Sequence, residues 1–226
     1  MPRHSDVVYQ GLVKHTIFVP SLTWEGTRQL LKDLHFPAGT TQVEFDFSGM
    51  TRVEPFGMLV ASRAIHMFRA DHRDIRFHAV NHETGDGCSY AAHVGFFKTF
   101  GLQFGKDAGE ASGNASYIPI TSCPVSELHE DVEAYGGRIG DHLITQSRNL
   151  AKVLARSGTG TLHDVLAYSI REILRNIVEH SKALSYEYCA QFWPSKHRVK
   201  VAILDRGVGV RETLRAHPKL REKLKY

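Results

Sequence analysis

Three polar residues near the C-terminus have the spacing of one edge of a helix. Glu172, Asn176 and His180 follow one another at one-turn intervals, so a helix would place them in a row. An asparagine carbonyl is an oxygen ligand of the kind that Mg²⁺ prefers. A carboxylate one turn earlier is suited to orient or deprotonate a water that attacks a phosphate. The spacing indicates magnesium-phosphate chemistry, whereas His180 better suits a helix end, where a cation complements the dipole.

A second polar group comes after a predicted strand. Residues 199–204 are rich in apolar residues and lead to Asp205, which Gly207 and Gly209 follow. A carboxylate at the end of a strand can accept a hydrogen bond from the exocyclic amine of adenine. The glycines let the backbone approach a ligand with a positive φ. An ordinary strand-to-loop turn also favours Asp and Gly, so a turn without a ligand is the alternative, as a solvated helix edge is for Glu172 and Asn176.

The order of these two motifs resembles the GHKL family of ATP-binding domains, shared by histidine kinases, anti-sigma-factor kinases, gyrase-type topoisomerases and Hsp90-type chaperones. Residues 172–176, Glu-Ile-Leu-Arg-Asn, resemble the N box of the family. Residues 205–209, Asp-Arg-Gly-Val-Gly, resemble its first glycine box. The resemblance covers residues 139–210, the first half to two thirds of such a domain.

The resemblance implies a role for each motif residue. ATP and Mg²⁺ would be the cofactors, with Asn176 as the Mg²⁺ ligand and Asp205 as the adenine ligand. Glu172 would be the catalytic base or an orienting group, and Gly207 and Gly209 would border the mobile lid. An active protein of this type would be an ATPase or a protein kinase.

The family's lid, second glycine-rich box and further strands have no counterpart before Tyr226. This departure predicts either a fragment of a longer protein or a domain that has lost ATP binding. We expect weak or absent ATP binding by these 226 residues, because the backbone N–H groups that hold the phosphates would be missing.

Other chemistries have less support. His78, His82, Cys88 and His93 could be assembled into a metal site, but no spacing typical of zinc ligands accompanies them. The glycine-lysine pattern of a P-loop does not occur.

The surrounding elements follow from hydrophobic periodicity. Residues 139–154 and 161–181 predict helices, the second with a capping box at Thr161 and Asp164. Residues 186–192 and 199–204 predict a hairpin that turns at Pro194-Ser195-Lys196-His197, and 117–120 a further strand. We expect the second helix to bury five apolar residues against this sheet, namely Leu166, Ile170, Ile173, Leu174 and Ile177. Glu172 and Asn176 should then border a cavity that Asp205 also lines.

The N-terminal part alternates strands and helices. Strands are predicted at 15–19, 43–47 and 75–80, and helices at 24–34, 57–70 and 90–100. This order predicts an α/β fold and resembles a STAS domain, the fold of anti-sigma-factor antagonists. The whole chain is thus expected to be α/β (α+β): a STAS-like domain at 1–105, a linker and connecting segment at 106–136, and a partial GHKL-type sandwich at 137–226.

The STAS resemblance centres on residues 45–49 and 53–58. Where that family carries a phosphorylated serine, this chain has Pro55 and Phe56. We therefore expect a binding surface without a phosphorylation switch, with Pro55 fixing the start of a helix and Phe56 packed inward. Phosphorylation of Ser48 is the alternative.

Composition limits the class of protein. The formal net charge of +4 is too small to indicate nucleic-acid binding. No apolar run is long enough for a membrane span, no signal peptide is expected, and the three cysteines are typical of free thiols in a reducing cytoplasm. The first hypothesis is an ATP-binding regulatory protein with a regulatory protein partner. The alternative is a non-catalytic protein-interaction module with degenerate STAS and ATPase-like domains.

Overall fold

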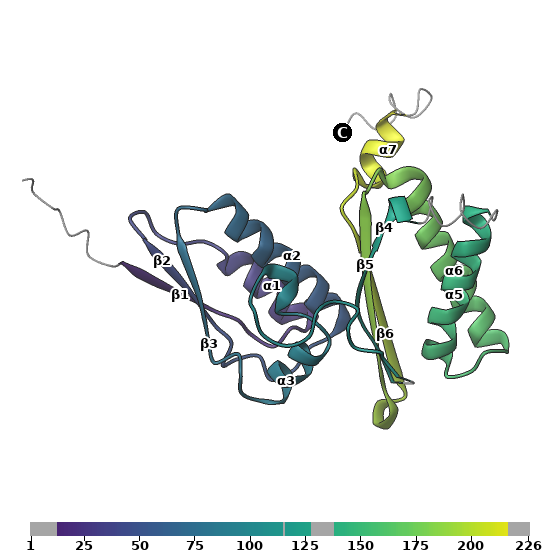
Figure 1. Cartoon of the computed structure of the whole chain (residues 1–226), viewed down its shortest axis with the longest axis horizontal. Helices are drawn as coiled ribbons and strands as arrows, with labels where there is room; N and C mark the ends of the chain where they lie inside the picture. Colours follow the sequence, from purple (N-terminus) through teal and green to yellow (C-terminus); the bar gives the residue numbers. More distant parts are fainter. Residues whose placement is uncertain (1–12, 115, 128–137, 217–226) are drawn as a thin grey trace, which may run out of the picture.

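The computed structural model describes residues 13–114, 116–127 and 138–216, which form two units, each with a three-stranded sheet. Figure 1 shows the first unit on one side of the second sheet and a pair of helices on the other side. The first sheet is parallel and the second antiparallel. The mixed α/β class expected from the sequence is confirmed. In the described part of the chain, no helix has the length and apolar character needed to cross a membrane.

The first unit consists of parallel strands joined by helices. β1 (Lys14–Phe18), β2 (Gln42–Asp46) and β3 (Arg76–Val80) pair in that order. α1 (Trp24–Asp33) joins β1 to β2, and α2 (Pro55–Asp71) joins β2 to β3. These elements agree with the predicted ones to within two or three residues at each end.

The core of this unit lies between the sheet and its helices. In β2, Val43 and Phe45 are buried while Gln42 and Glu44 are only half-buried. This alternation is typical of a strand with one face on the core. Proline at the first position of α2 suits a helix start, because the N–H that proline lacks has no partner inside the helix there.

The last helix of the first unit differs from its predicted bounds of 90–100. α3 (Asp86–His93) begins and ends earlier, and a separate 3₁₀ turn, η1 (Lys98–Phe100), follows it. Gly95 separates the two with a φ of 92°, which interrupts a right-handed helix. The break lets Phe96 and Phe97 both enter the core, where they are fully buried.

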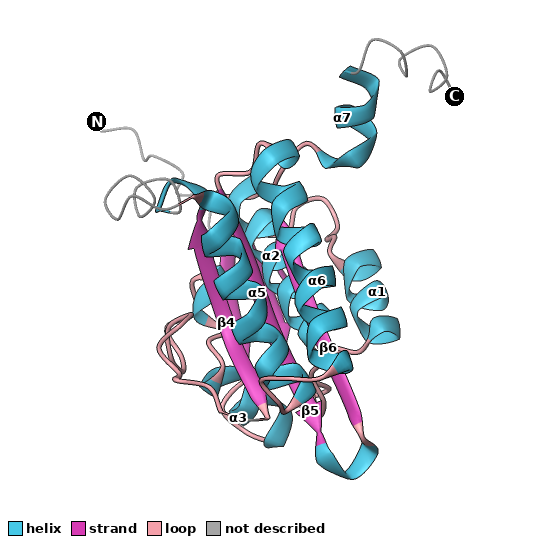
Figure 2. Ribbon diagram, turned by 90° about the vertical axis from the view of Figure 1, so that its right-hand side faces the viewer, coloured by secondary structure: helices cyan, strands magenta, loops and turns pink. Residues whose placement is uncertain are grey.

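The second unit is an antiparallel sheet under two helices. β4 (Tyr117–Pro124), β5 (Ser185–Trp193) and β6 (Arg198–Asp205) pair in that order, and α5 (Ile139–Ala155) and α6 (Thr161–Asn176) cover one face (Figure 2). The predicted hairpin is confirmed, with a 3₁₀ turn, η3 (Pro194–Lys196), between its strands. The predicted helices are confirmed too, although α6 continues as a π-helical turn, η2 (Ile177–Ser181), before the chain enters β5.

Two details of α6 contradict the sequence predictions. Thr161 is the first helical residue and Gly160 is the N-cap, without a side-chain hydrogen bond, so the predicted capping box is wrong. Ile170, Leu174 and Ile177 are buried as expected, but Ile173 is 46% exposed. The apolar stripe faces the sheet along most of the helix, and Ile173 lies beyond the edge of that contact.

The other face of the antiparallel sheet packs on the first unit. Alternate residues of β5 point to opposite sides: Tyr186 and Ala190 join the core under α5 and α6, whereas Cys189 joins the core of the first unit. The Cys189 thiol donates to the carbonyl of Pro55 at the start of α2 (3.5 Å). The sheet is therefore covered on both faces, and the two units share one interface.

The segment predicted as a linker is held by backbone hydrogen bonds to its neighbours. Lys106 N donates to Ala92 O of α3, and Gly109 N donates to Ile120 O of β4 (2.7 Å). Ala111 is buried. A glycine is required at Gly105, because its φ is 79° and a Cβ there would lie 2.4 Å from Ala92 O.

Candidate functional site

A cavity of about 390 Å³ lies where the end of α6 meets the end of β6. Its walls come from the last turn of α6, the π-helical turn η2, strand β6 and the short helix α7 (Gly209–Ala216). The lining residues are Ile173, Asn176, Ile177, His180, Ser181, Ile203, Asp205, Gly209 and Leu214. Most of this wall is apolar, and the polar groups gather at the helix end and the strand end.

The helix end and the loop after β6 are locked together. Ser181 Oγ donates to Ile177 O (2.8 Å) and accepts from Ala183 N (3.0 Å), which closes the π-helical turn. Val208 N donates to Ser181 O (2.7 Å). A Cβ on Gly207 would lie 2.1 Å from Ser181 O, so only glycine permits this approach. Gly207 thus lies behind the cavity wall and fixes the loop.

Asp205 stands at the strand end with its carboxylate held in a defined orientation. It follows the alternation of β6, in which Val199 and Ile203 face the α5 and α6 side. Asp205 Oδ1 accepts from Gly207 N (2.7 Å), an Asx turn that fixes the side chain. Oδ2 has no hydrogen bond among the described residues, so it can accept from a ligand in the cavity.

Asn176 and His180 reach the same cavity from the helix side. Asn176 is exposed to the cavity mouth. His180 is near Glu179, with 3.8 Å between Nε2 and the carboxylate. Gly209 begins α7 at the rim with a φ of 72°. The predicted neighbourhood of Asn176 and Asp205 is thus present in the structure.

Glu172 is not among the lining residues. It lies one turn before Asn176, about 6 Å back along the helix axis. Its carboxylate accepts from its neighbour Arg171, at 2.8 Å from Nη2 and 3.2 Å from Nε. Arg171 in turn lies over the Tyr168 ring, 5.1 Å from its centroid. The structure therefore separates the predicted site residues: Asn176, Asp205 and Gly209 line the cavity, while Glu172 and Gly207 lie outside its lining.

Sequence reasoning missed the apolar wall of the site. Ile173 was expected in the core and instead lines the cavity, together with Ile203 and Leu214. The available signal was spacing, since Ile173 and Ile177 are one turn apart beside Asn176 and His180. Leu214 gave no signal, because its place depends on the direction that α7 takes after Gly209.

The arrangement is suited to a flat, partly polar ligand. An apolar wall with a fixed carboxylate at one end can hold an aromatic base and accept a hydrogen bond from its amine. A single asparagine oxygen is a weak metal site by itself, so Mg²⁺ here would also take oxygens from water and from the ligand. Among the described residues, no group of three or more His, Cys, Asp and Glu side chains could hold a metal ion, so the assembly of His78, His82, Cys88 and His93 does not exist.

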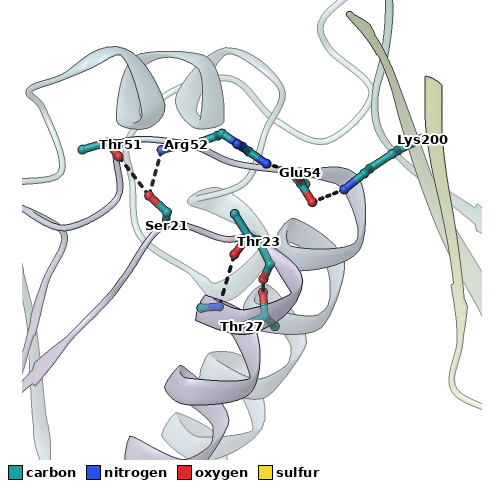
Figure 3. A network of polar contacts seen from close by, with 8 residues as sticks. Ser21, Thr23, Thr27, Thr51, Arg52, Glu54 and Lys200 are labelled. Carbon is teal, nitrogen blue, oxygen red and sulfur yellow. Dashed lines mark hydrogen bonds and ion pairs between the residues drawn. The ribbon is translucent and has the colours of Figure 1, made fainter. Parts of the chain in front are cut away.

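The loop before α2 contacts the second unit (Figure 3). Glu54 is 4% exposed and is paired with Arg52, at 2.5 Å, and with Lys200 of β6. Burial alone would raise the pKa of the Glu54 carboxyl, but the hydrogen bonds and charges of Lys200 and Arg52 outweigh it and leave the pKa below its ordinary value. The start of α2 is thereby tied to the sheet that carries Asp205.

Pro55 and Phe56 at the start of α2 have separate roles. Pro55 is the first residue of α2. Phe56 is 37% exposed and contacts Trp24 with 4.9 Å between ring centroids, so the expectation of an inward Phe56 is wrong. Its position in the first turn of α2 points it toward α1 rather than toward the sheet. Ser48 is exposed, and its backbone N–H donates to Asp46 Oδ1.

No protein-family model, no curated protein and no solved structure matches the chain.

Proposed function

We propose that this chain is an adenine nucleotide-binding regulatory protein of the histidine kinase-like ATPase type, acting in the cytoplasm. The observation that supports this most is the cavity shared by Asn176 and Asp205, two residues from different elements. The sequence motifs suggested this neighbourhood, and Ile173, Ile177, Ile203 and Leu214 supply an apolar wall beside it. The volume of about 390 Å³ lies in the range of small-ligand pockets.

Each residue has a defined part in this proposal. Asp205 Oδ2 accepts from the adenine amine, while Ile173, Ile177 and Ile203 contact the base. Asn176 contributes an oxygen to Mg²⁺, whose remaining ligands are water and phosphate oxygens. Glu172 lies one turn outside the cavity and orients water near the phosphates if the nucleotide is hydrolysed.

The test is a titration with adenosine and with Mg-ATP, followed by calorimetry or ligand-observed NMR. We expect dissociation constants between about 10 μM and 1 mM, which correspond to binding free energies of about −7 to −4 kcal/mol. The cavity can contact the base, but it offers few hydrogen-bond donors to the phosphates. Asp205→Asn should weaken adenosine binding about tenfold, because an amide that presents its NH₂ group repels the adenine amine.

The matched control is Asp74→Asn, an exposed carboxylate of the first unit outside this cavity. It removes the same charge and should leave the affinity unchanged. Equal affinity of the parent and Asp205→Asn, or no binding of adenosine up to several millimolar, would contradict the proposal.

A protein-interaction module is the second candidate function, and one observation favours it. Trp24 and Phe56 are 53% and 37% exposed and pack on each other at the surface of the first unit. Exposed aromatic pairs are enriched where proteins bind partners. Two results together would support this function in place of the first. The chain would bind no nucleotide, and the Trp24→Ser variant would no longer bind the regulatory partner.

A further inference from the structure

A second cavity, of about 610 Å³, lies in the first unit at the end of α2. The last two turns of α2, the start of β3 and the turn η1 form its walls. It shares no lining residue with the Asp205 cavity. The two cavities are therefore separate candidate sites.

The charges around this cavity have one sign. Arg69 comes from α2, Arg73 from the loop after it, and Lys98 from η1. His66 and His72 also line it, and no Asp or Glu does. Lys98 has a carboxylate partner outside the lining, Asp107, at 3.0 Å. A cavity lined by cations concentrates positive potential and attracts anions.

The charges that act on His66 come mostly from outside the cavity lining, since of Arg63, Arg206 and Arg69 only Arg69 lines it. Burial lowers the pKa of His66, and Arg63, Arg206 and Arg69 lower it further, with Glu187 opposing them weakly. The cations thus repel a further positive charge in this region. A bound anion would relieve that repulsion.

The Arg69 guanidinium is held in place, and one of its N–H donors has no partner among the described residues. It donates from Nη1 to Phe100 O and lies over the Phe77 ring, 5.8 Å from the centroid. Its Nε is buried and has no hydrogen-bond partner among the described residues. Gly101, with a φ of 87°, leaves room for this guanidinium, since a Cβ there would lie 3.1 Å from Nη1. An unpaired buried donor costs free energy unless an acceptor reaches it.

The histidine beside it is oriented as well. His72 Nδ1 lies 2.7 Å from Phe68 O, so Nδ1 donates to this carbonyl and fixes the ring. The rest of the wall is apolar, with Ile75, Phe77 and Phe100. The lining thus combines cationic groups with apolar ones.

We propose that this cavity binds a small organic phosphate, with the phosphate at Arg69, Arg73 and Lys98 and the organic part against Phe77 and Phe100. Guanidinium groups suit phosphate oxygens because their N–H donors form paired, charge-assisted hydrogen bonds. Cations at the end of a helix also complement its dipole, but Lys98 comes from another element and contributes nothing to α2 in that way.

Pyrophosphate is the probe for the test, because it carries the charge without an organic part. We expect Arg73→Gln combined with Lys98→Gln to weaken pyrophosphate binding at least about tenfold, since two charge-assisted hydrogen bonds are lost. Arg28→Gln is the control, because Arg28 is exposed on α1 and does not line the cavity. It should leave the affinity unchanged.

An NMR titration of His66 gives a second readout that misfolding cannot imitate. Saturating pyrophosphate should raise the pKa of His66, because the anion offsets the charges of Arg63, Arg69 and Arg206. Equal affinity of the double variant and the parent would overturn the proposal. An equal loss in Arg28→Gln, or a pKa of His66 that pyrophosphate leaves in place, would also overturn it.

Discussion

The two faces of the antiparallel sheet make contacts of different kinds. Toward α5 and α6 the contact is apolar, with Tyr186 and Ala190 buried and a cavity left open beside Asp205. Toward α2 the contact combines buried Cys189 with the ion pair of Lys200 and Glu54. Because side chains alternate between the two faces along β5 and β6, each strand contributes residues to both contacts. The difference indicates that the apolar face holds the second unit together, while the polar face sets how the first unit is joined to it.

The largest effect is expected on the apolar face. Tyr186 is fully buried, and its hydroxyl donates to Gln146 Oε1 at 2.6 Å. Tyr186→Ala should lower the free energy of unfolding by about 3–5 kcal/mol, because a large cavity opens. Tyr186→Phe keeps the ring and should cost only about 1 kcal/mol. Urea denaturation measures both, and equal losses would show that the hydrogen bond rather than packing stabilises this face.

A second effect is expected where the two motifs meet. Gly207→Ala places a Cβ 2.1 Å from Ser181 O, so the loop after β6 must move away from the end of α6. We expect a loss of about 1–3 kcal/mol in stability and weaker adenosine binding through displacement of Asp205. Gly158→Ala is the control, since a Cβ there meets only side-chain atoms of Lys152 at 3.9 Å or more. A Gly207→Ala variant as stable as Gly158→Ala would contradict the described contact.

The sequence predicts those parts of the fold that are determined by residues close together in the chain. The bounds of α5, α6 and the β5–β6 hairpin follow from periodicity and turn residues, which are local. The break at Gly95 was not predicted, because the apolar residues around it favour one continuous helix and do not indicate a positive φ.

The site was predicted less completely. Asn176 and Asp205 were placed on one cavity correctly. Glu172 was placed there too, but it lies one turn back along α6, outside the lining, and pairs with Arg171. The contact of Glu54 with Lys200 joins residues far apart in the sequence, and no pattern in either segment predicts it.

A moderate effect is expected on the polar face, and it depends on pH. Glu54 has a pKa lowered from 4.5 in the folded chain, so its stabilisation is present above about pH 4.5 and is lost as the pH falls through the folded value. Glu54→Gln should cost about 1–2 kcal/mol at pH 7 and should flatten the loss of stability below pH 4.5. Glu44→Gln, which removes the more exposed pair with Lys14, should cost less than about 1 kcal/mol. Parallel pH profiles for the parent and Glu54→Gln would contradict this assignment.

The smallest effect is expected at the surface of the first unit. Phe56→Ala removes the ring contact with Trp24, worth about 0.5–1 kcal/mol. Met67→Ala, also exposed and on the same helix, should change stability by less than about 0.5 kcal/mol. Thermal unfolding compares the two, and a loss of several kcal/mol at Phe56 would mean that this ring belongs to the core.

The most direct test of the central claim is an adenosine titration followed by the amide signals of the whole chain. Adenosine carries no phosphate, so it does not report on the Arg69 cavity. We expect the largest shift changes on the side-chain amide of Asn176 and on the backbone amides of Gly207 and Gly209, next to Asp205. Shift changes that gather around Arg69 and Lys98, or none at saturating adenosine, would contradict the nucleotide site.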